Sequence, residues 1–232
     1  MGDALSSSGI AAHGVLLPGH GTDPRDLDAV RRSAWHDAVR DAFLALDDER
    51  PRFVVGSSMG ALLAIALAAE QGARVDGLVL LAPALELFPA GVLGGALARA
   101  GLFRRGRDIP KEARGGDIGD ADARALNPTY PVMSWPGLAE FDRLRGEARA
   151  ALPHVVSPTL VLHGAHDATV KPSGARLVSA LTSAPIVDRE VLARSKHIIG
   201  VDHERAHVAR RTLVFLERLL AAHGLPPVEA RR

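Results

Sequence analysis

The sequence predicts an α/β fold, in which helices cover both faces of a mostly parallel sheet. Short runs of β-branched and apolar residues alternate along the chain with longer segments whose apolar residues recur at helical spacing. Two of the runs, residues 75–82 and 159–163, are apolar nearly throughout, which is typical of parallel strands buried on both faces. Because 232 residues can bury one sizeable core, we expect a single domain over residues 1–232.

The composition excludes several classes of protein. The formal charge of +1 gives no indication of a nucleic-acid partner, and the lack of cysteine removes disulfides and thiolate metal sites. No apolar run approaches the ~20 residues of a membrane-spanning helix, and residues 1–9 are too polar for a secretory signal. We therefore expect a cytoplasmic protein without an integral membrane segment, and the sequence leaves its oligomeric state open.

The first third of the chain contains two predicted strands and two predicted helical segments. Residues 9–17 are expected to form a strand, which leads into a loop of turn-forming residues at 18–24. Apolar residues at near-helical spacing between Asp26 and Leu46 predict one long or interrupted helix. The run at 52–55 is a second strand, and residues 61–71 form a helix that is apolar nearly all round, as in a helix packed on a sheet.

Residues 84–150 differ from the rest and are interpreted as an insertion between core elements. Residues 91–103 are a short apolar helix candidate, 104–120 are rich in glycine and charge, and 127–136 contain three prolines. No strand fits this region convincingly. A cap over a site and an irregular surface excursion both remain open, and the apolar helix favours the cap.

The last third returns to the alternating pattern. A strand at 159–163 is followed by a helix at 172–181, a last strand at 186–192 and a final helix at 203–223. In parallel sheets of this kind, reacting groups gather beyond the carboxyl ends of the strands. Polar residues directly after strands are therefore the first candidates for a functional site.

The turn at 56–60 has the sequence Gly56-x-Ser58-x-Gly60, the spacing of a nucleophile elbow. Glycines on either side allow the serine to take a strained backbone conformation, since larger side chains would collide across the turn. The next amide, Met59 N–H, then lies at a helix N-terminus, where it can stabilise an oxyanion. The alternative is an ordinary Gly/Ser turn, but the position between a buried strand and a helix favours the elbow.

Ser58, Asp167 and His197 each come just after the carboxyl end of a predicted strand. A serine hydroxyl is a poor nucleophile at neutral pH and needs an adjacent base, which a carboxylate holds in the correct tautomer. These three residues therefore form a candidate catalytic triad in the chain order Ser, Asp, His.

Five stretches carry a resemblance to a known family: LLPGHGTDP (16–24), GSSMG (56–60), LVLLAPAL (78–85), PTLVLHGAHDATV (158–170) and SKHIIGVDHERAHV (195–208). The sequence resembles the carboxylesterase and monoacylglycerol-lipase branch of the α/β-hydrolases. The resemblance implies a serine hydrolase that cleaves small-molecule acyl esters through an acyl-serine intermediate, without a cofactor or metal. It implies Ser58 as nucleophile, His197 as general base and then acid, and Asp167 as the residue that orients His197, with Met59 N–H as one oxyanion donor.

The sequence departs from this family at its N-terminal side. The family has a strand ending in a His-Gly-aromatic turn, then a helix, before the stretch that matches residues 16–24, and this chain begins about where that helix is expected. The turn would supply the second oxyanion donor, and its strand would lie between residues 10–17 and 52–56. We therefore expect a chain that is poorly stable and weakly active, or one in which residues 10–17 pair directly with 52–56.

Two other functions remain open. His203-Glu204-x-x-His207 matches H-E-x-x-H, in which two histidines on one helical face bind zinc and the glutamate acts as base; a zinc metalloprotease is thus an alternative, although no suitable third ligand follows. A catalytically impaired, truncated hydrolase or pseudoenzyme is the other. His20, His163 and His166 are interpreted as supporting or surface residues.

The insertion is expected to supply an apolar pocket for the acyl group above Ser58. The candidate lining residues are Leu85, Leu87, Phe88, Leu93, Leu97 and Leu102.

Overall fold

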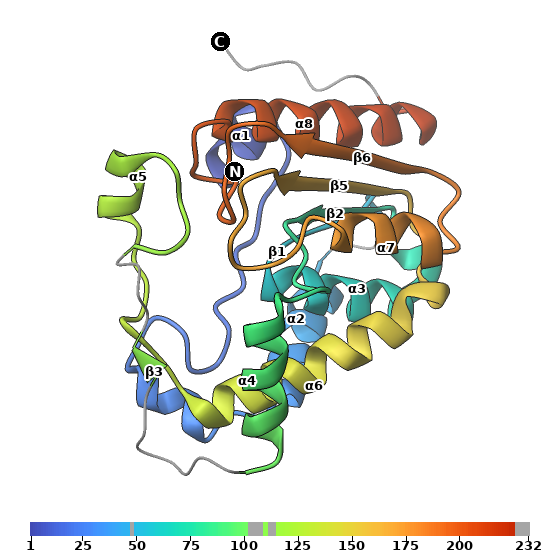
Figure 1. Cartoon of the computed structure of the whole chain (residues 1–232). Coiled ribbons are helices and arrows are strands. Elements are labelled where there is room, and N and C mark those ends of the chain that lie inside the picture. The colour runs from blue at the N-terminus through green and yellow to red at the C-terminus, as the bar shows by residue number, and fades with distance from the viewer. Residues whose placement is uncertain (47–48, 102–108, 111–114, 226–232) are drawn as a thin grey trace.

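A computed structural model describes residues 1–46, 49–101, 109–110 and 115–225 of the chain. Its centre is a four-stranded, all-parallel sheet in the order β1-β2-β5-β6, with a two-stranded sheet, β3-β4, outside it (Figure 1). The strands of the main sheet are β1 (Phe53–Ser57), β2 (Gly77–Leu81), β5 (Thr159–Gly164) and β6 (Val187–Leu192). The α/β class, the parallel sheet and the positions of these four strands were all predicted from the sequence.

Helices cover both faces of the sheet, as predicted (Figure 1). On one face lie α2 (Arg32–Leu44), α3 (Met59–Gln71) and α7 (Gly174–Leu181), with α6 (Trp135–Ala151) packed outside α2 and α3. On the other lie α8 (Arg205–Ala222) and the short α1 (Gly2–Ser7). Single 3₁₀ turns occur at η1 (Pro24–Asp28), η2 (Gly72–Arg74) and η3 (Leu152–His154).

The two faces of the sheet carry separate cores because side chains alternate along each strand. Leu78, Leu80 and Val161 pack with the fully buried residues of α3. Their neighbours in sequence, among them Val79 and Leu160, pack instead with Phe215 and Leu216 of α8. Strands that are apolar on both faces are thus explained by two helical layers.

Residues 9–17 do not form the predicted strand. They are extended but belong to no ladder, and they do not pair with β1. A groove of about 260 Å³ separates residues 13–17 from β1, with α2 and α3 as its floor. Leu16 is 74% exposed. The apolar pattern of residues 9–17 is suited to a strand. A strand forms, however, only beside a neighbour whose free backbone groups lie at pairing distance. None of the described segments lies at that distance from residues 9–17.

The insertion contains more regular structure than predicted. Its apolar helix is α4 (Pro89–Arg99), followed by α5 (Ala121–Leu126), and β3 (Ile109–Pro110) pairs antiparallel with β4 (Val132–Met133). The expectation of no strand was therefore wrong for two short segments. Figure 1 shows α4 packed against α6 and α5 standing away from the core. No helix in the described ranges is both long and apolar enough to cross a membrane.

The long helix α6 was not predicted because charged residues occupy part of its buried face. Glu140 and Asp142 are buried there. Glu140 accepts hydrogen bonds from the backbone and guanidinium of Arg32, and Asp142 pairs with Arg99 of α4. A Cβ on Gly95 would lie 2.9 Å from the Asp142 carboxyl carbon, so the glycine allows α4 and α6 to approach closely. These contacts fix α4 to the core.

Candidate active site

Ser58 lies at the turn between β1 and α3 and has a left-handed backbone conformation, with φ 53° and ψ −114°. A non-glycine residue rarely takes a positive φ, and such strain is common at functional sites. A Cβ on Gly56 would lie 2.3 Å from the carbonyl oxygen of Gly60, so only glycine fits there. A Cβ on Gly60 would meet nothing within 4 Å, so the expected collision holds for the first glycine and not for the second.

The three candidate triad residues are brought together from the ends of three strands. Ser58 Oγ is 2.8 Å from His197 Nε2, and His197 Nδ1 is 2.7 Å from Asp167 Oδ2. The Asp167 side chain is fully buried, and that of His197 is 7% exposed. The hydroxyl of Ser58, the imidazole and the carboxylate thus form one continuous hydrogen-bonded chain.

Asp167 is held as an anion despite its burial. Its Oδ1 accepts hydrogen bonds from the backbone N–H groups of Thr169 and Val170, both at 2.8 Å. Burial by itself raises the pKa of Asp167, but interactions with His163, His197 and Val170 N–H outweigh it and hold this pKa well below its usual range. An ionised Asp167 accepts a hydrogen bond from Nδ1–H of His197, and this tautomer leaves Nε2 unprotonated and able to accept a hydrogen bond from the Ser58 hydroxyl.

The model of the alpha/beta hydrolase family matches residues 3–212, which is most of the chain. The chain belongs to the alpha/beta hydrolase family.

Solved structures of similar fold include several hydrolases. One, reported with the metagenome-derived lipolytic enzymes LipS and LipT, is 23% identical over 94% of this chain and 86% of its own, with a TM-score of 0.84. A soluble variant of monoglyceride lipase from Saccharomyces cerevisiae is 16% identical over 86% and 74%, with a TM-score of 0.71. Est1E from Butyrivibrio proteoclasticus, with ferulic acid bound, is 20% identical over 95% and 81%, with a TM-score of 0.65. These likenesses support the fold.

In this hydrolase the loops that carry Asp167 and His197 cross at Gly164. A Cβ on Gly164 would lie 1.9 Å from the carbonyl oxygen of Lys196, so a side chain at this position would push the loops apart. Next to the crossing, His166 N–H donates to the carbonyl of Ser195 at 3.1 Å. The glycine in the stretch 158–170 is therefore required by the contact between the two loops.

Asp117, from the insertion, binds both of these loops, and the sequence analysis did not identify it. Its carbonyl oxygen accepts from the N–H groups of His197 and Ile198 at 3.1 and 3.2 Å. Its carboxylate accepts from Ala168 N–H at 2.8 Å and from the Thr169 hydroxyl at 3.2 Å. One residue thus links the segment after Asp167 to the backbone of His197.

Asp202 is a second residue that sequence reasoning did not identify. It is fully buried, and its oxygens accept hydrogen bonds of 2.7–2.9 Å from four backbone amides, those of Gly119, Asp120, Lys196 and His203. Burial raises the pKa of Asp202, but these amides outweigh it and keep its pKa below the usual value. No sequence motif identifies Asp117 or Asp202, because their hydrogen-bond partners come from segments far apart in the chain. The only hint in the sequence was the charge-rich composition around residues 117–120.

Met59 is the first residue of α3, directly after Ser58. The first N–H groups of a helix have no intrahelical partner, whereas the N–H of Ser58 itself donates to the carbonyl of Leu81 at 2.9 Å. The Met59 amide therefore lies at the positive end of the α3 dipole, and its role as an oxyanion donor stays a prediction.

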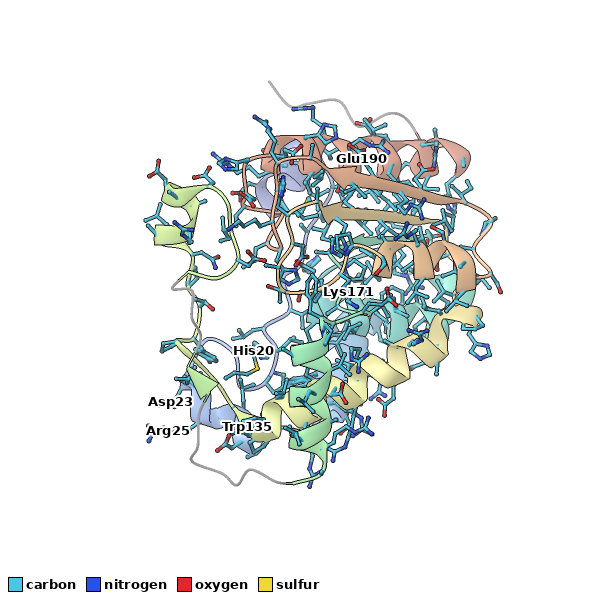
Figure 2. The ribbon with its side chains drawn as sticks, viewed as in Figure 1. His20, Asp23, Arg25, Trp135, Lys171 and Glu190 are labelled. Carbon is cyan, nitrogen blue, oxygen red and sulfur yellow. The ribbon has the colours of Figure 1, made fainter. Side chains whose placement is uncertain are left out.

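The candidate pocket residues have very different exposures. Leu85 is fully buried in the core and Leu87 is 8% exposed, whereas Phe88 and Leu93 are 37% and 61% exposed. Leu97 is partly buried, and Leu102 lies outside the described residues. Burial within the core gives no support to a lining role for Leu85. Lys171, labelled in Figure 2, lies with its Nζ 5.9 Å from the centre of the Phe88 ring.

The insertion also contacts the loop at 18–24. The hydroxyl of Tyr130 donates to the carbonyl of Gly19 and accepts from the N–H of Thr22, both at 3.0 Å. His20, labelled in Figure 2, lies on this loop and packs edge-on against Trp35. The Trp35 indole N–H donates to the carbonyl of Pro18 at 3.0 Å. His20 therefore packs against Trp35 and helps to hold the loop at 18–24 in place.

The H-E-x-x-H stretch does not have the geometry of a zinc site. Helix α8 begins at Arg205, so His203 precedes the helix and does not share a helical face with His207. Glu204 accepts from the Ser195 hydroxyl at 2.6 Å, and His207 Nε2 lies 2.5 Å from Glu190, which is labelled in Figure 2. In the part of the chain that the structure describes, no three His, Cys, Asp or Glu side chains are grouped as metal ligands. The metalloprotease alternative gains no support.

Proposed function

We propose that this protein is a serine hydrolase that cleaves carboxylic esters through an acyl-Ser58 intermediate. The observation that carries the proposal is the continuous chain of hydrogen bonds from Ser58 through His197 to the buried Asp167, at 2.8 and 2.7 Å. The lipolytic enzymes and the monoglyceride lipase among the structural neighbours give further support. The proposed substrates are small-molecule acyl esters of the type cleaved by carboxylesterases and monoacylglycerol lipases.

In the first half of the proposed reaction, Ser58 Oγ attacks the ester carbonyl while His197 Nε2 takes the hydroxyl proton. The tetrahedral intermediate places a negative charge on the former carbonyl oxygen, and Met59 N–H is the proposed donor to it. Collapse breaks the bond to the alcohol, which leaves with the proton from His197. Ser58 is then acylated.

In the second half, water attacks the acyl-Ser58 carbonyl and gives a proton to His197 Nε2. The second tetrahedral intermediate collapses to release the carboxylic acid, and His197 returns the proton to Ser58 Oγ. Asp167 remains ionised throughout and stabilises the imidazolium that forms twice in each cycle.

The acyl group is proposed to lie against the exposed apolar residues at the start of α4. Phe88 and Leu93 are accessible there, and Leu97 lies one turn further along the helix. Leu93→Trp is expected to shift the preference among p-nitrophenyl esters toward shorter acyl chains, with Leu126→Trp on the remote α5 as control. An unchanged preference in both variants would remove α4 from the acyl site.

The decisive experiment compares the wild type with Ser58→Ala on p-nitrophenyl butyrate and with a fluorophosphonate probe. We expect turnover and labelling in the wild type and neither in Ser58→Ala. Ser57→Ala is the matched control, because Ser57 is the exposed neighbour of Ser58 at the end of β1. Turnover that persists in Ser58→Ala would contradict the proposal, whereas labelling of Ser58 without turnover would assign the impaired-hydrolase alternative.

A further inference from the structure

His163 is a fully buried histidine in β5 that the proposed chemistry does not use. Its Nε2 lies 2.9 Å from Asp167 Oδ2. This is the same oxygen that His197 Nδ1 approaches to 2.7 Å. The carboxylate of the candidate triad is thus shared by two imidazole rings.

Packing does not explain a histidine at this position. The preceding strand residues, Leu160 to Leu162, are apolar and fully buried. Neither His163 ring nitrogen makes an aligned hydrogen bond to a described residue. Since a buried polar atom without a partner is unfavourable, Nδ1 by itself destabilises the fold.

The contact with Asp167 is what can explain a histidine at position 163. At 2.9 Å the two atoms are at hydrogen-bonding separation, and the N–H is only misaligned. Rotation about the last torsion of a histidine is soft, so a small turn of the ring aligns it. Hydrogen bonding from His163 also contributes to the lowered pKa of Asp167, after the opposing effect of burial.

We infer that His163 is a positioning residue, which anchors the Asp167 carboxylate to the sheet and takes up part of its negative charge through an Nε2–H donor. Thr169 and Val170, which bind the other oxygen, belong to the same loop as Asp167 and move with it. His163 instead lies in β5, which the ladders with β2 and β6 hold on both sides. It therefore fixes Oδ2 relative to the rest of the fold.

This inference rests on the proposed function, and its first test is kinetic. His163→Leu is expected to lower kcat about ten-fold, the effect of one hydrogen bond to a charged group, with KM unchanged. The melting temperature should change little, because the loss of the donor to Asp167 is offset by the removal of the unpartnered Nδ1. His163→Gln can place an N–H at a similar reach and should recover most of the loss. The control is His166→Leu, because His166 is exposed and lies next to Asp167 in the loop after β5.

A double-mutant cycle separates positioning from a general packing effect. If His163 acts through the Asp167 carboxylate, His163→Leu should cost little further kcat in an Asp167→Asn background. The inference is overturned if kcat is unchanged in the single variant, if the full loss persists in the double variant, or if unfolding of the variant at the assay temperature accounts for the whole loss of kcat.

A spectroscopic test does not depend on turnover and so distinguishes this inference from the proposed function. In ¹⁵N-correlated spectra of the histidine side chains, we expect His163 as the Nε2–H tautomer. The proton on His197 Nδ1 should move downfield in His163→Leu, because Oδ2 then has one donor fewer, and return in His163→Gln. A His197 proton that is the same in all three proteins would overturn the inference, whether or not the protein hydrolyses esters.

Discussion

The two sides of Ser58 are built very differently. On one side, the loops carrying Asp167 and His197 are buried and tied to each other, to β5 and to residues 117–120 by hydrogen bonds to both backbone and side chains. On the other, β1 is the edge of the sheet, and the extended residues 13–17 lie across a groove from it. Many hydrogen bonds from several segments therefore fix the side with Asp167 and His197, whereas β1 is paired along only one of its two edges in the described part of the chain.

This difference shows which part of the proposed chemistry is preorganised. A base and its orienting carboxylate act only when they are held within tenths of an ångström, and the many donors around Asp167 and Asp202 provide that rigidity. Charge stabilisation at the oxyanion needs the same rigidity on the β1 side, where Met59 N–H is the one donor proposed above. The four predictions below test the contrast, from the largest expected effect to the smallest.

The strongest test of the rigid side is Asp167→Asn. The amide keeps the shape of the side chain but favours the wrong tautomer of His197, so we expect kcat to fall about 10⁴-fold, as in serine proteases with this change. Ester turnover at pH 8 measures it, with His166→Ala as the control in the same loop. A larger loss in His166→Ala would show that the wrong residue of this loop has been assigned.

Amide hydrogen exchange tests the β1 side without a substitution. Backbone groups alternate between the two edges of a strand. Arg52 C=O accepts from the N–H of Asp76, directly before β2, and Ser58 N–H donates to Leu81 at the end of β2. Val54 and Gly56 therefore face β2, whereas Val55 and Ser57 face the groove. Val55 and Ser57 should exchange about 10³-fold faster. Equal protection along β1 would mean that the groove is closed by a paired segment in solution.

Asp202→Asn tests the rigid side through stability. Four backbone N–H groups converge on this carboxylate, so we expect a loss of about 2–3 kcal/mol in the free energy of unfolding at pH 7, on the order of 100-fold in the folding equilibrium. Because folding lowers the pKa of Asp202, its contribution is complete above the ordinary value of 3.8 and is lost as the pH falls below it.

Urea titrations of the wild type and Asp202→Asn at several pH values measure this effect. The two curves should be furthest apart near pH 7 and converge below about pH 4. Asp122→Asn is the control, because Asp122 is exposed and belongs to the same insertion. A difference that stays constant down to pH 3 would show that the ionised carboxylate is not the cause.

The smallest expected effect is that of Asp117→Ala. This change removes the acceptor for Ala168 N–H and the Thr169 hydroxyl but keeps the carbonyl that binds His197 N–H. We expect kcat to fall about ten-fold with little change in KM, the effect of one or two hydrogen bonds. The control is Asp122→Ala, and a kcat equal to the wild type would mean that the loop after Asp167 keeps its position without this carboxylate.

The sequence predicted features that depend on local pattern. Buried strands such as β2 and β5 have near-continuous apolar runs, and the glycine–serine turn at 56–60 identified the elbow, because both signals lie within a few residues. The segment 9–17 had the same kind of pattern and yet is not a strand, since strand formation depends on a neighbour that the pattern cannot show. Helix α6 was missed because Glu140 and Asp142 occupy buried positions on it. Their burial depends in part on Arg32 and Arg99, which come from other segments of the chain.

The candidate triad was assigned from chain order and motif, and the residues that hold it were not. Asp117 and Asp202 are ordinary aspartates in the sequence, and only the crossing of distant segments brings backbone amides to them. The interpretation of His163 as a supporting residue did not include its contact with Asp167. Contacts of this kind depend on tertiary geometry, which a single sequence does not contain.

The contact between the insertion and the loop at 18–24 also affects how the protein can be observed. The chain has two tryptophans and one tyrosine, and all three lie in this corner: Trp35 against the loop, Tyr130 bonded to it, and Trp135 at the start of α6 (Figure 2). The intrinsic ultraviolet fluorescence therefore reports on this one region of the molecule. A ligand that moves the insertion should change the emission directly, so binding can be followed without an attached dye, whereas loosening of β6 or α8 alone should leave the emission unchanged.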